Sequence, residues 1–159
     1  MSMFDLTDKN AIVTGGNSGI GFAIAEGLAR HGARIVIANR DEARGMAAVG
    51  RLLQQGLLAE TVPTDVSESS QVTRLIDTVL QRHGHIDILV NSAAVIARKP
   101  AEEFTDDDWD RIINTNLRGA FLCCREAGRH MIAQRKGKII NISSNVSQVV
   151  QPLRSIYCI

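Results

Sequence analysis

The fold is decided by the stretch Thr14-Gly15-Gly16-Asn17-Ser18-Gly19-Ile20-Gly21. It follows a short β-branched run, residues 11–14, and precedes residues 22–29, whose apolar side chains repeat at helical spacing. Glycines in such a turn let a pyrophosphate approach the backbone, and the free amides of the following helix favour negative charge. The stretch lacks the Gly-Lys-Ser/Thr ending of a triphosphate-binding loop, which argues against an ATPase. A dinucleotide-binding turn and a tight packing turn both stay open.

Short apolar runs and longer amphipathic stretches alternate along the rest of the chain. This alternation predicts an α/β fold built from βαβ units around a parallel sheet. Ser67 and Thr105 are expected to cap helices, and Gly56 and Gly84 to end them. Strands are expected at 34–38, 57–62, 86–90 and 138–142, and helices at 41–55, 67–83, 105–113 and 118–134.

The composition excludes several classes of protein. With 159 residues, a net charge of +1, 45% apolar and 22% charged residues, the chain is neither disordered nor strongly basic. The pairs Arg98-Lys99 and Arg135-Lys136 lack interleaved aromatics, so we expect no nucleic-acid partner. Met1–Asp5 does not resemble a secretory signal and no apolar run approaches ~18 residues. We therefore expect no membrane partner and a cytoplasmic location.

The cysteines and histidines show no ligand spacing. Cys123 and Cys124 are adjacent, Cys158 stands apart, and the four histidines are scattered. This pattern predicts neither a metal site nor a disulfide framework, and it places the cysteines in the core.

The spacing TGxxxGxG resembles the short-chain dehydrogenase/reductase family, and further family landmarks follow in order. The resemblance covers practically the whole chain, and it implies a Rossmann-type doubly wound parallel sheet with strand order 3-2-1-4-5, in a single NAD(P)-binding domain over residues 1–159. One departure is Ala94, which replaces a family glycine. The landmarks are Asp65-Val66, Asn91-Ser92-Ala93-Ala94 in place of Asn-Asn-Ala-Gly, Asn116-Leu117-Arg118-Gly119, Ser143-Ser144, and Tyr157 thirteen residues after Ser144.

The resemblance also implies roles for individual residues. Tyr157 exchanges a proton with the carbonyl or hydroxyl oxygen while hydride moves between substrate and nicotinamide, and Ser144 hydrogen-bonds that oxygen. Asn116 holds a helix carbonyl and a water in a proton relay. A free tyrosine ionises only near pH ~10, so proton transfer at neutral pH requires nearby positive charge. The implied cofactor-binding residues are Thr14, Gly15, Asn17, Ser18, Gly19, Ile20, Gly21, Asn39, Arg40, Asp65, Val66, Asn91 and Ala93.

The end of the second strand predicts the cofactor. An acid there binds the ribose 2′-hydroxyl of NAD, whereas a basic residue accepts the 2′-phosphate of NADP. Neutral Asn39 followed by Arg40 favours NADP, and Asp41 is expected to cap the next helix instead. Ser18 stands where some NADP-preferring relatives carry a basic residue, and it adds no support.

The substrate is predicted by resemblance alone. Arg98-Lys99-Pro100 and residues 125–131 resemble sugar-acid dehydrogenases such as the gluconate 5-dehydrogenases. A basic loop would attract a carboxylate, although a charged surface loop explains it equally well. The expected substrate is thus a small-molecule alcohol or ketone. The competing substrate class is a 3-oxoacyl-carrier protein, which the enzyme would reduce.

The family's catalytic lysine would fall at position 161, beyond Ile159. We therefore expect a domain that lacks its last strands and leaves the fifth strand as an exposed apolar edge. Two hypotheses stay open: an NAD(P)-dependent oxidoreductase that interconverts a secondary alcohol and a ketone, and a catalytically dead dinucleotide-binding fragment. For a complete protein, the resemblance implies a homotetramer or homodimer.

Overall fold

Five parallel strands form the sheet in the computed structural model, which describes residues 4–158. Their order is β3-β2-β1-β4-β5, so the predicted 3-2-1-4-5 topology is confirmed. Residues 1–3, with which the sequence compared to a secretory signal begins, and Ile159 lie outside the described residues. The strands are β1 (Asn10–Thr14), β2 (Arg34–Asn39), β3 (Ala59–Pro63), β4 (Ile88–Asn91) and β5 (Lys138–Asn141).

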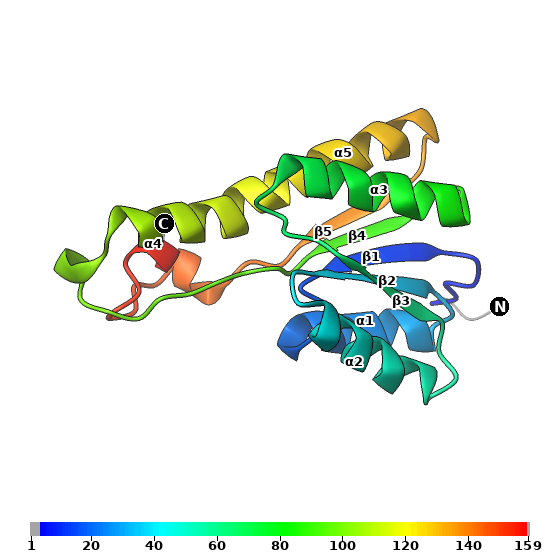
Figure 1. The fold of residues 1–159 in the computed structure, drawn as a ribbon, viewed down its shortest axis with the longest axis horizontal. Coiled ribbons are helices and arrows are strands. Elements are labelled where there is room, and N and C mark those ends of the chain that lie inside the picture. Colours follow the sequence, from blue (N-terminus) through cyan, green and yellow to red (C-terminus); the bar gives the residue numbers. More distant parts are fainter. Residues whose placement is uncertain (1–3, 159) are drawn as a thin grey trace.

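Helices cover both faces of this sheet (Figure 1). Helices α1 (Gly19–Arg30) and α2 (Glu42–Leu53) lie on one face, and α3 (Ser69–His83) and α5 (Gly119–Ala133) on the other. Successive strand residues point to opposite faces. Thus Ile12 packs in the buried cluster on the α3 and α5 side, whereas Val13 packs with residues of α1 and α2. The strands of the interior are buried on both faces, as in parallel sheets generally.

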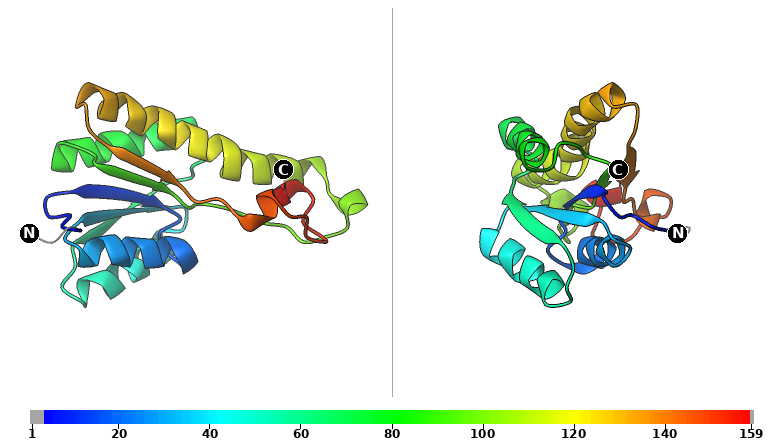
Figure 2. Two further views of the ribbon diagram at one scale, coloured as in Figure 1. Left: turned by 180° about the vertical axis from the view of Figure 1, so that it is seen from behind. Right: turned by 90° about the vertical axis from the view of Figure 1, so that its right-hand side faces the viewer.

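The last two helices form one long rod (Figure 2, left). Helix α4 (Asp106–Ile113) continues through the π-helical segment η2 (Asn114–Arg118) into α5. The prediction of two separate helices at 105–113 and 118–134 is therefore wrong about the break, because no glycine or proline interrupts residues 114–118. The start is confirmed: Thr105 Oγ1 accepts from Asp108 N at 3.2 Å, and Asp108 Oδ2 accepts from Thr105 N at 3.1 Å.

Ser67 does not cap α3. The cap position is Glu68, which makes no side-chain cap bond. The Ser67 hydroxyl instead donates to Asp65 Oδ1 at 2.6 Å, because the aspartate two residues earlier competes for it in a local turn. Gly84 ends α3 in a left-handed conformation with φ +80°, as predicted.

Other element boundaries differ by a few residues. Strand β3 begins at Ala59 and includes Pro63, which is tolerated because β3 is an edge strand. Helix α2 ends at the cap residue Gln54, and Gly56, with φ +74°, turns the chain two residues later. Strand β4 begins at Ile88, two residues later than predicted.

Asp87, just before β4, joins the amino-terminal ends of several strands. It is 4% exposed; its Oδ2 accepts from Asn10 N at 3.0 Å and lies 3.1 Å from His85 Nε2, and its Oδ1 lies 3.0 Å from Lys136 Nζ. Burial raises the pKa of Asp87, but the Asn10 amide, the Lys136 ammonium and His85 together outweigh burial and hold this pKa below its usual value.

Strand β5 is an exposed edge, as expected. Ile139 and Ile140 are 39% and 44% exposed. The cysteine prediction holds for buried Cys123 and is wrong for Cys124 and Cys158, which are half-buried. Within residues 4–158, no helix has the length and apolar character needed to cross a bilayer.

Candidate cofactor and active site

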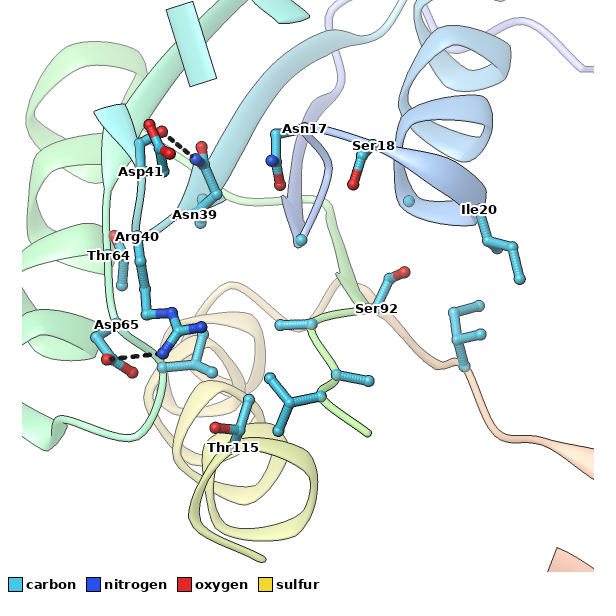
Figure 3. A pocket seen from close by; sticks show the side chains of 18 of the residues that line it. Asn17, Ser18, Ile20, Asn39, Arg40, Asp41, Thr64, Asp65, Ser92 and Thr115 are labelled. Atoms are coloured by element: carbon cyan, nitrogen blue, oxygen red, sulfur yellow. Dashed lines mark hydrogen bonds and ion pairs between the residues drawn. The ribbon is translucent and has the colours of Figure 1, made fainter. Parts of the chain in front are cut away.

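A cavity of about 510 Å³ opens at the carboxyl ends of the strands, where the chain order reverses between β1 and β4. Ligands of open α/β sheets bind at this switch point. Figure 3 shows the cavity from close by, with Asn17 and Ser18 on one side and Arg40 and Asp65 on another. The predicted site residues that line it are Gly15, Asn17, Ser18, Ile20, Gly21, Asn39, Arg40, Asp65, Val66, Ala93, Ser144 and Tyr157.

The glycine turn packs directly on the loop after β4. Gly15 has φ +66°, and a Cβ there would lie 2.9 Å from Ala93 Cα. A Cβ on Gly21 would lie 2.5 Å from the Gly15 carbonyl oxygen. Neither position therefore accepts a side chain without moving backbone, and the amino terminus of α1 is held against the cavity. Gly19 has φ +54° and open space around it, and it does not line the cavity.

Thr14 lies beneath the cavity rather than in its wall. It is 1% exposed, and its Oγ1 accepts hydrogen bonds from Ser92 N and Ala93 N, each at 3.1 Å. The end of β1 thereby holds the loop after β4 in place.

Arg40 brings positive charge to the end of β2. Its side chain crosses the cavity wall toward Asp65, with Nη1 3.9 Å from Asp65 Oδ2 (Figure 3). Asn39 is 7% exposed; its Nδ2 donates to the Asp41 carbonyl at 2.5 Å, and its Oδ1 accepts from Thr61 Oγ1 at 3.3 Å. Asp41 caps α2, as predicted, by accepting from Arg44 N at 3.0 Å.

Asp65 and Val66 line the same cavity as the glycine turn. Asp65 Oδ1 accepts from the Ser67 amide at 3.0 Å as well as from its hydroxyl, which fixes the carboxylate at the cavity edge. Val66 is 5% exposed and packs on α5, where a Cβ on Gly119 would lie 2.7 Å from Val66 Cγ2. The family-like glycine at 119 is thus required by the close approach of Val66.

Ser144 and Tyr157 lie in the walls of the same cavity. Both also line a second cavity of about 420 Å³ on the α5 side. Ser144 precedes the short 3-10 turn η3 (Asn145–Ser147), and its Oγ accepts from Val146 N at 3.4 Å. Tyr157 lies in the turn η4 (Ile156–Cys158), which buried Ile156 anchors. The structure therefore brings the two predicted catalytic side chains to one place.

Asn116 lies in η2 and faces the loop after β4. Its Oδ1 accepts from Val95 N at 2.8 Å, and its Nδ2 donates to the Val95 carbonyl at 2.9 Å. The side-chain amide therefore contacts a loop carbonyl rather than a helix carbonyl, and the proton relay through Asn116 stays a prediction. Asn116 and Asn91 both line the second cavity and not the first.

Sequence reasoning missed several residues of the cavity wall. Arg44, in the first turn of α2, is a second arginine of the cavity wall. Ser92 and Ala94 belong to the landmark that follows β4 but were not assigned to the site. No sequence pattern singled out the remaining residues, which include Ala38, Thr64, Val95 and Thr115. Within residues 4–158, the His, Cys, Asp and Glu side chains form no group that could hold a metal ion.

Comparison with known proteins gives one consistent picture. Residues 9–159 match the family model for short chain dehydrogenase. Gluconate 5-dehydrogenase of Gluconobacter oxydans is 37% identical over 150 residues, 94% of this chain and 59% of the relative. The 5-keto-D-gluconate 5-reductase of Escherichia coli K12 is 35% identical over 147 residues, 92% of this chain and 58% of the relative.

Solved structures agree with these relatives. A gluconate 5-dehydrogenase from Burkholderia cenocepacia, in complex with NADP and tartrate, superposes with a TM-score of 0.90 at 41% identity. That match covers 98% of this chain and 61% of the other. The chain thus spans about three fifths of the length of the proteins it matches.

Proposed function

The chain belongs to the short-chain dehydrogenase family, and from this premise we propose that the whole protein is an NAD(P)-dependent oxidoreductase. The reaction interconverts a secondary alcohol and a ketone by hydride transfer. One observation carries the proposal: a single cavity is lined by the glycine turn and Arg40 and also by Ser144 and Tyr157. A dinucleotide-binding surface and a proton-donating group therefore share one space.

The residues present fit a dinucleotide. The turn at Gly15 and Gly21 has no room for a Cβ, and it leads into the first turn of α1, whose free amides suit a pyrophosphate. Asp65 and Val66 line the wall where the adenine is expected. When bound, the dinucleotide supplies or accepts the hydride.

The chain's own groups move the proton. We assign to Tyr157 the donation of its phenolic proton to the carbonyl oxygen in reduction and the return of that proton in oxidation. To Ser144 we assign a hydrogen bond to the same oxygen, which would stabilise the negative charge that develops there. The test is carbonyl-dependent oxidation of NADPH by the whole protein. Its absence with every carbonyl class tested would contradict the proposal.

We propose NADP rather than NAD as the cofactor. Arg40 is the cation at the end of β2, while Asn39 is neutral and the Asp41 carboxylate accepts the first-turn amide of α2. A guanidinium suits a 2′-phosphate, whereas a free carboxylate would repel it. The complex of the Burkholderia relative with NADP supports this choice.

The cofactor proposal is tested by titration of Arg40→Ala with NADPH and NADH. Loss of a charge-assisted contact, about 1.5–3 kcal/mol, weakens NADPH binding roughly ten- to a hundredfold. NADH affinity should stay within about threefold of wild type. The control is Arg74→Ala, on the exposed face of α3. A loss confined to NADH would refute the proposal.

The proposed substrate is a sugar acid or related polyol. Lys99 forms an ion pair with Asp108, and its Nζ lies 5.4 Å from the centroid of the Phe104 ring. Arg98 is exposed, so we assign to Arg98 the binding of the substrate carboxylate. The names of the Gluconobacter and Escherichia relatives support this class. The test compares 5-ketogluconate, a neutral ketose and a 3-oxoacyl thioester as substrates. Preference for the thioester would favour the competing class, reduction of a 3-oxoacyl-carrier protein.

A further inference from the structure

The loop after β4 is hydrogen-bonded to the segment that leads to Tyr157. The Lys99 amide donates to the Leu153 carbonyl oxygen at 3.0 Å. Lys99 follows Arg98, to which we assign the substrate carboxylate, and Leu153 precedes Tyr157 by four residues. This backbone bond therefore joins the loop that carries the proposed carboxylate-binding group to the segment that carries the proposed proton donor.

Leu153 has an unusual backbone conformation. Its φ is +65°, in the left-handed region, where the side chain of an L-residue crowds the following carbonyl oxygen. Pro152 and Leu153 form a tight turn, and in such turns a residue with positive φ after the proline is most often glycine or asparagine. Leucine is strained at this position. A strained residue persists only where its surroundings hold it.

The amide that holds Leu153 is itself fixed at two points. Lys99 precedes Pro100, and the proline ring favours an extended backbone for Lys99. The Lys99 ammonium forms an ion pair with Asp108, whose Oδ2 also accepts from the Thr105 amide at 3.1 Å at the start of α4. The direction of the Lys99 amide is therefore set by Pro100 and by the start of α4.

The conformation of Leu153 decides the course of the chain into Tyr157. The turn η4 follows directly, and the Cys158 amide donates to the Arg154 carbonyl oxygen at 3.1 Å. A change of φ at Leu153 from +65° to the negative range that leucine prefers would turn this whole segment, because every following atom rotates with that bond. Tyr157 would then move relative to Ser144, with which it shares the cavity.

We propose that Leu153 and Lys99 are positioning residues: the left-handed turn at Leu153, held by the Lys99 amide, sets the place of Tyr157 for proton transfer. The same bond fixes Tyr157 relative to Arg98. This inference rests on the proposed oxidoreductase function. The backbone conformation of Leu153, rather than the contacts of its side chain, should therefore control the turnover rate.

The experiment varies the conformational preference of Leu153 in the whole protein. Leu153→Ile keeps the same atoms but moves the branch to Cβ, which makes a positive φ much less favourable. Leu153→Asn favours the left-handed conformation. Leu153→Met is the matched control, because methionine is similar in size to leucine and has no branch at Cβ.

The three variants should differ in kcat and agree in cofactor affinity. Leu153→Ile should lose roughly tenfold or more in kcat, since a displacement of about 1 Å at the reacting groups can cost about a hundredfold. The asparagine and methionine variants should keep wild-type kcat. KM for NADPH should stay within about twofold in all three, because the glycine turn and Arg40 lie on other elements.

Hydrogen exchange at the Lys99 amide supplies a readout that needs no turnover. Leu153→Ile should lose about tenfold or more of the protection of this amide, while the asparagine and methionine variants keep it. A wild-type protein without carbonyl-dependent NADPH oxidation would overturn the proposed function, and exchange at Lys99 would still test the turn.

Three results would overturn the positioning role itself. One is wild-type kcat in Leu153→Ile, whether or not the Lys99 amide keeps its protection. Another is an equal loss of kcat in the isoleucine, asparagine and methionine variants, because it would assign the effect to side-chain contacts of Leu153. The third is a fall in kcat that only follows a lower melting temperature.

Discussion

The side-chain amide of Asn116 hydrogen-bonds both backbone polar groups of Val95, at 2.8 and 2.9 Å, and so joins the π-helical segment to the loop after β4. Asn116→Ala removes both bonds, and we expect a loss of about 1–3 kcal/mol in stability because Val95 is left unpaired. The Val95 amide should exchange faster and kcat should fall. Asn116→Asp keeps an acceptor for the Val95 amide, so its stability and its exchange rate at Val95 should lie between those of wild type and Asn116→Ala. Unchanged exchange at Val95 in the alanine variant would contradict this role.

Tyr157→Phe removes the phenolic oxygen and leaves the ring. If Tyr157 is the proton donor, kcat should fall by roughly 10²–10⁴-fold. NADPH affinity, measured by fluorescence titration, should stay within about twofold, because the proposed phosphate contacts are made by the glycine turn and Arg40 rather than by Tyr157. Normal turnover in this variant would rule out the catalytic assignment.

Gly21→Ala tests the packing of the glycine turn. A methyl group at this position would meet the Gly15 carbonyl at 2.5 Å, so backbone must move and NADPH binding should weaken at least about tenfold. Gly27→Ala in the same helix is the matched control, since nothing lies within 4 Å of its added Cβ. That variant should bind normally and gain up to about 1 kcal/mol of stability. Equal effects at both positions would refute the steric argument.

Asp87→Asn tests the charge cluster at the amino-terminal edge. The pKa of Asp87 is lowered in the folded protein. The Asp87 charge therefore contributes fully to the free energy of unfolding above the unfolded-state pKa of about 4, and this contribution is lost as the pH falls through the folded-state pKa. At pH 7 the variant should be about 1–3 kcal/mol less stable than wild type. Urea unfolding between roughly pH 7 and 2 should show this difference shrinking on the acid side. A stability difference between wild type and variant that grows at acid pH would contradict this prediction.

Cys123 should resist alkylation in the folded protein. Burial, with a smaller contribution from the neighbouring Cys124, raises the pKa of the Cys123 thiol to about 12. Iodoacetamide at about pH 8 should therefore modify Cys124 and Cys158 first, as followed by peptide mass spectrometry. In denaturant all three should react. Rapid labelling of Cys123 in the native state would contradict its burial.

Much of the fold follows from local patterns. The buried strands have continuous apolar runs, and Thr105 with Asp108 has the spacing of a capping box, so these elements were predicted within one or two residues at most ends. The cavity residues at Gly15, Arg40, Ser144 and Tyr157 were also identified, because family motifs stand at fixed places relative to the strands.

What the patterns missed depends on contacts between distant segments. Nothing local indicates that Asn116 pairs with Val95 across 21 positions, or that Thr14 holds the amides of Ser92 and Ala93. Ser67 was misassigned because Asp65, two residues away, takes its hydroxyl. The continuity of α4 and α5 was missed because a π-helical turn has no distinct hydrophobic period.

The Asp87 cluster and the dinucleotide cavity occupy opposite ends of the same strands, separated by about four residues of β-structure at 3.3 Å each. Perturbations at such a distance add nearly independently. Substitutions that raise stability at the Asp87 end could therefore be made first. The added stability would then offset the loss caused by substitutions at the cavity that change cofactor or substrate preference. A change of chemistry at the cavity therefore does not require rebuilding the contacts that Asp87 makes with Asn10 and Lys136 at the other end of the sheet.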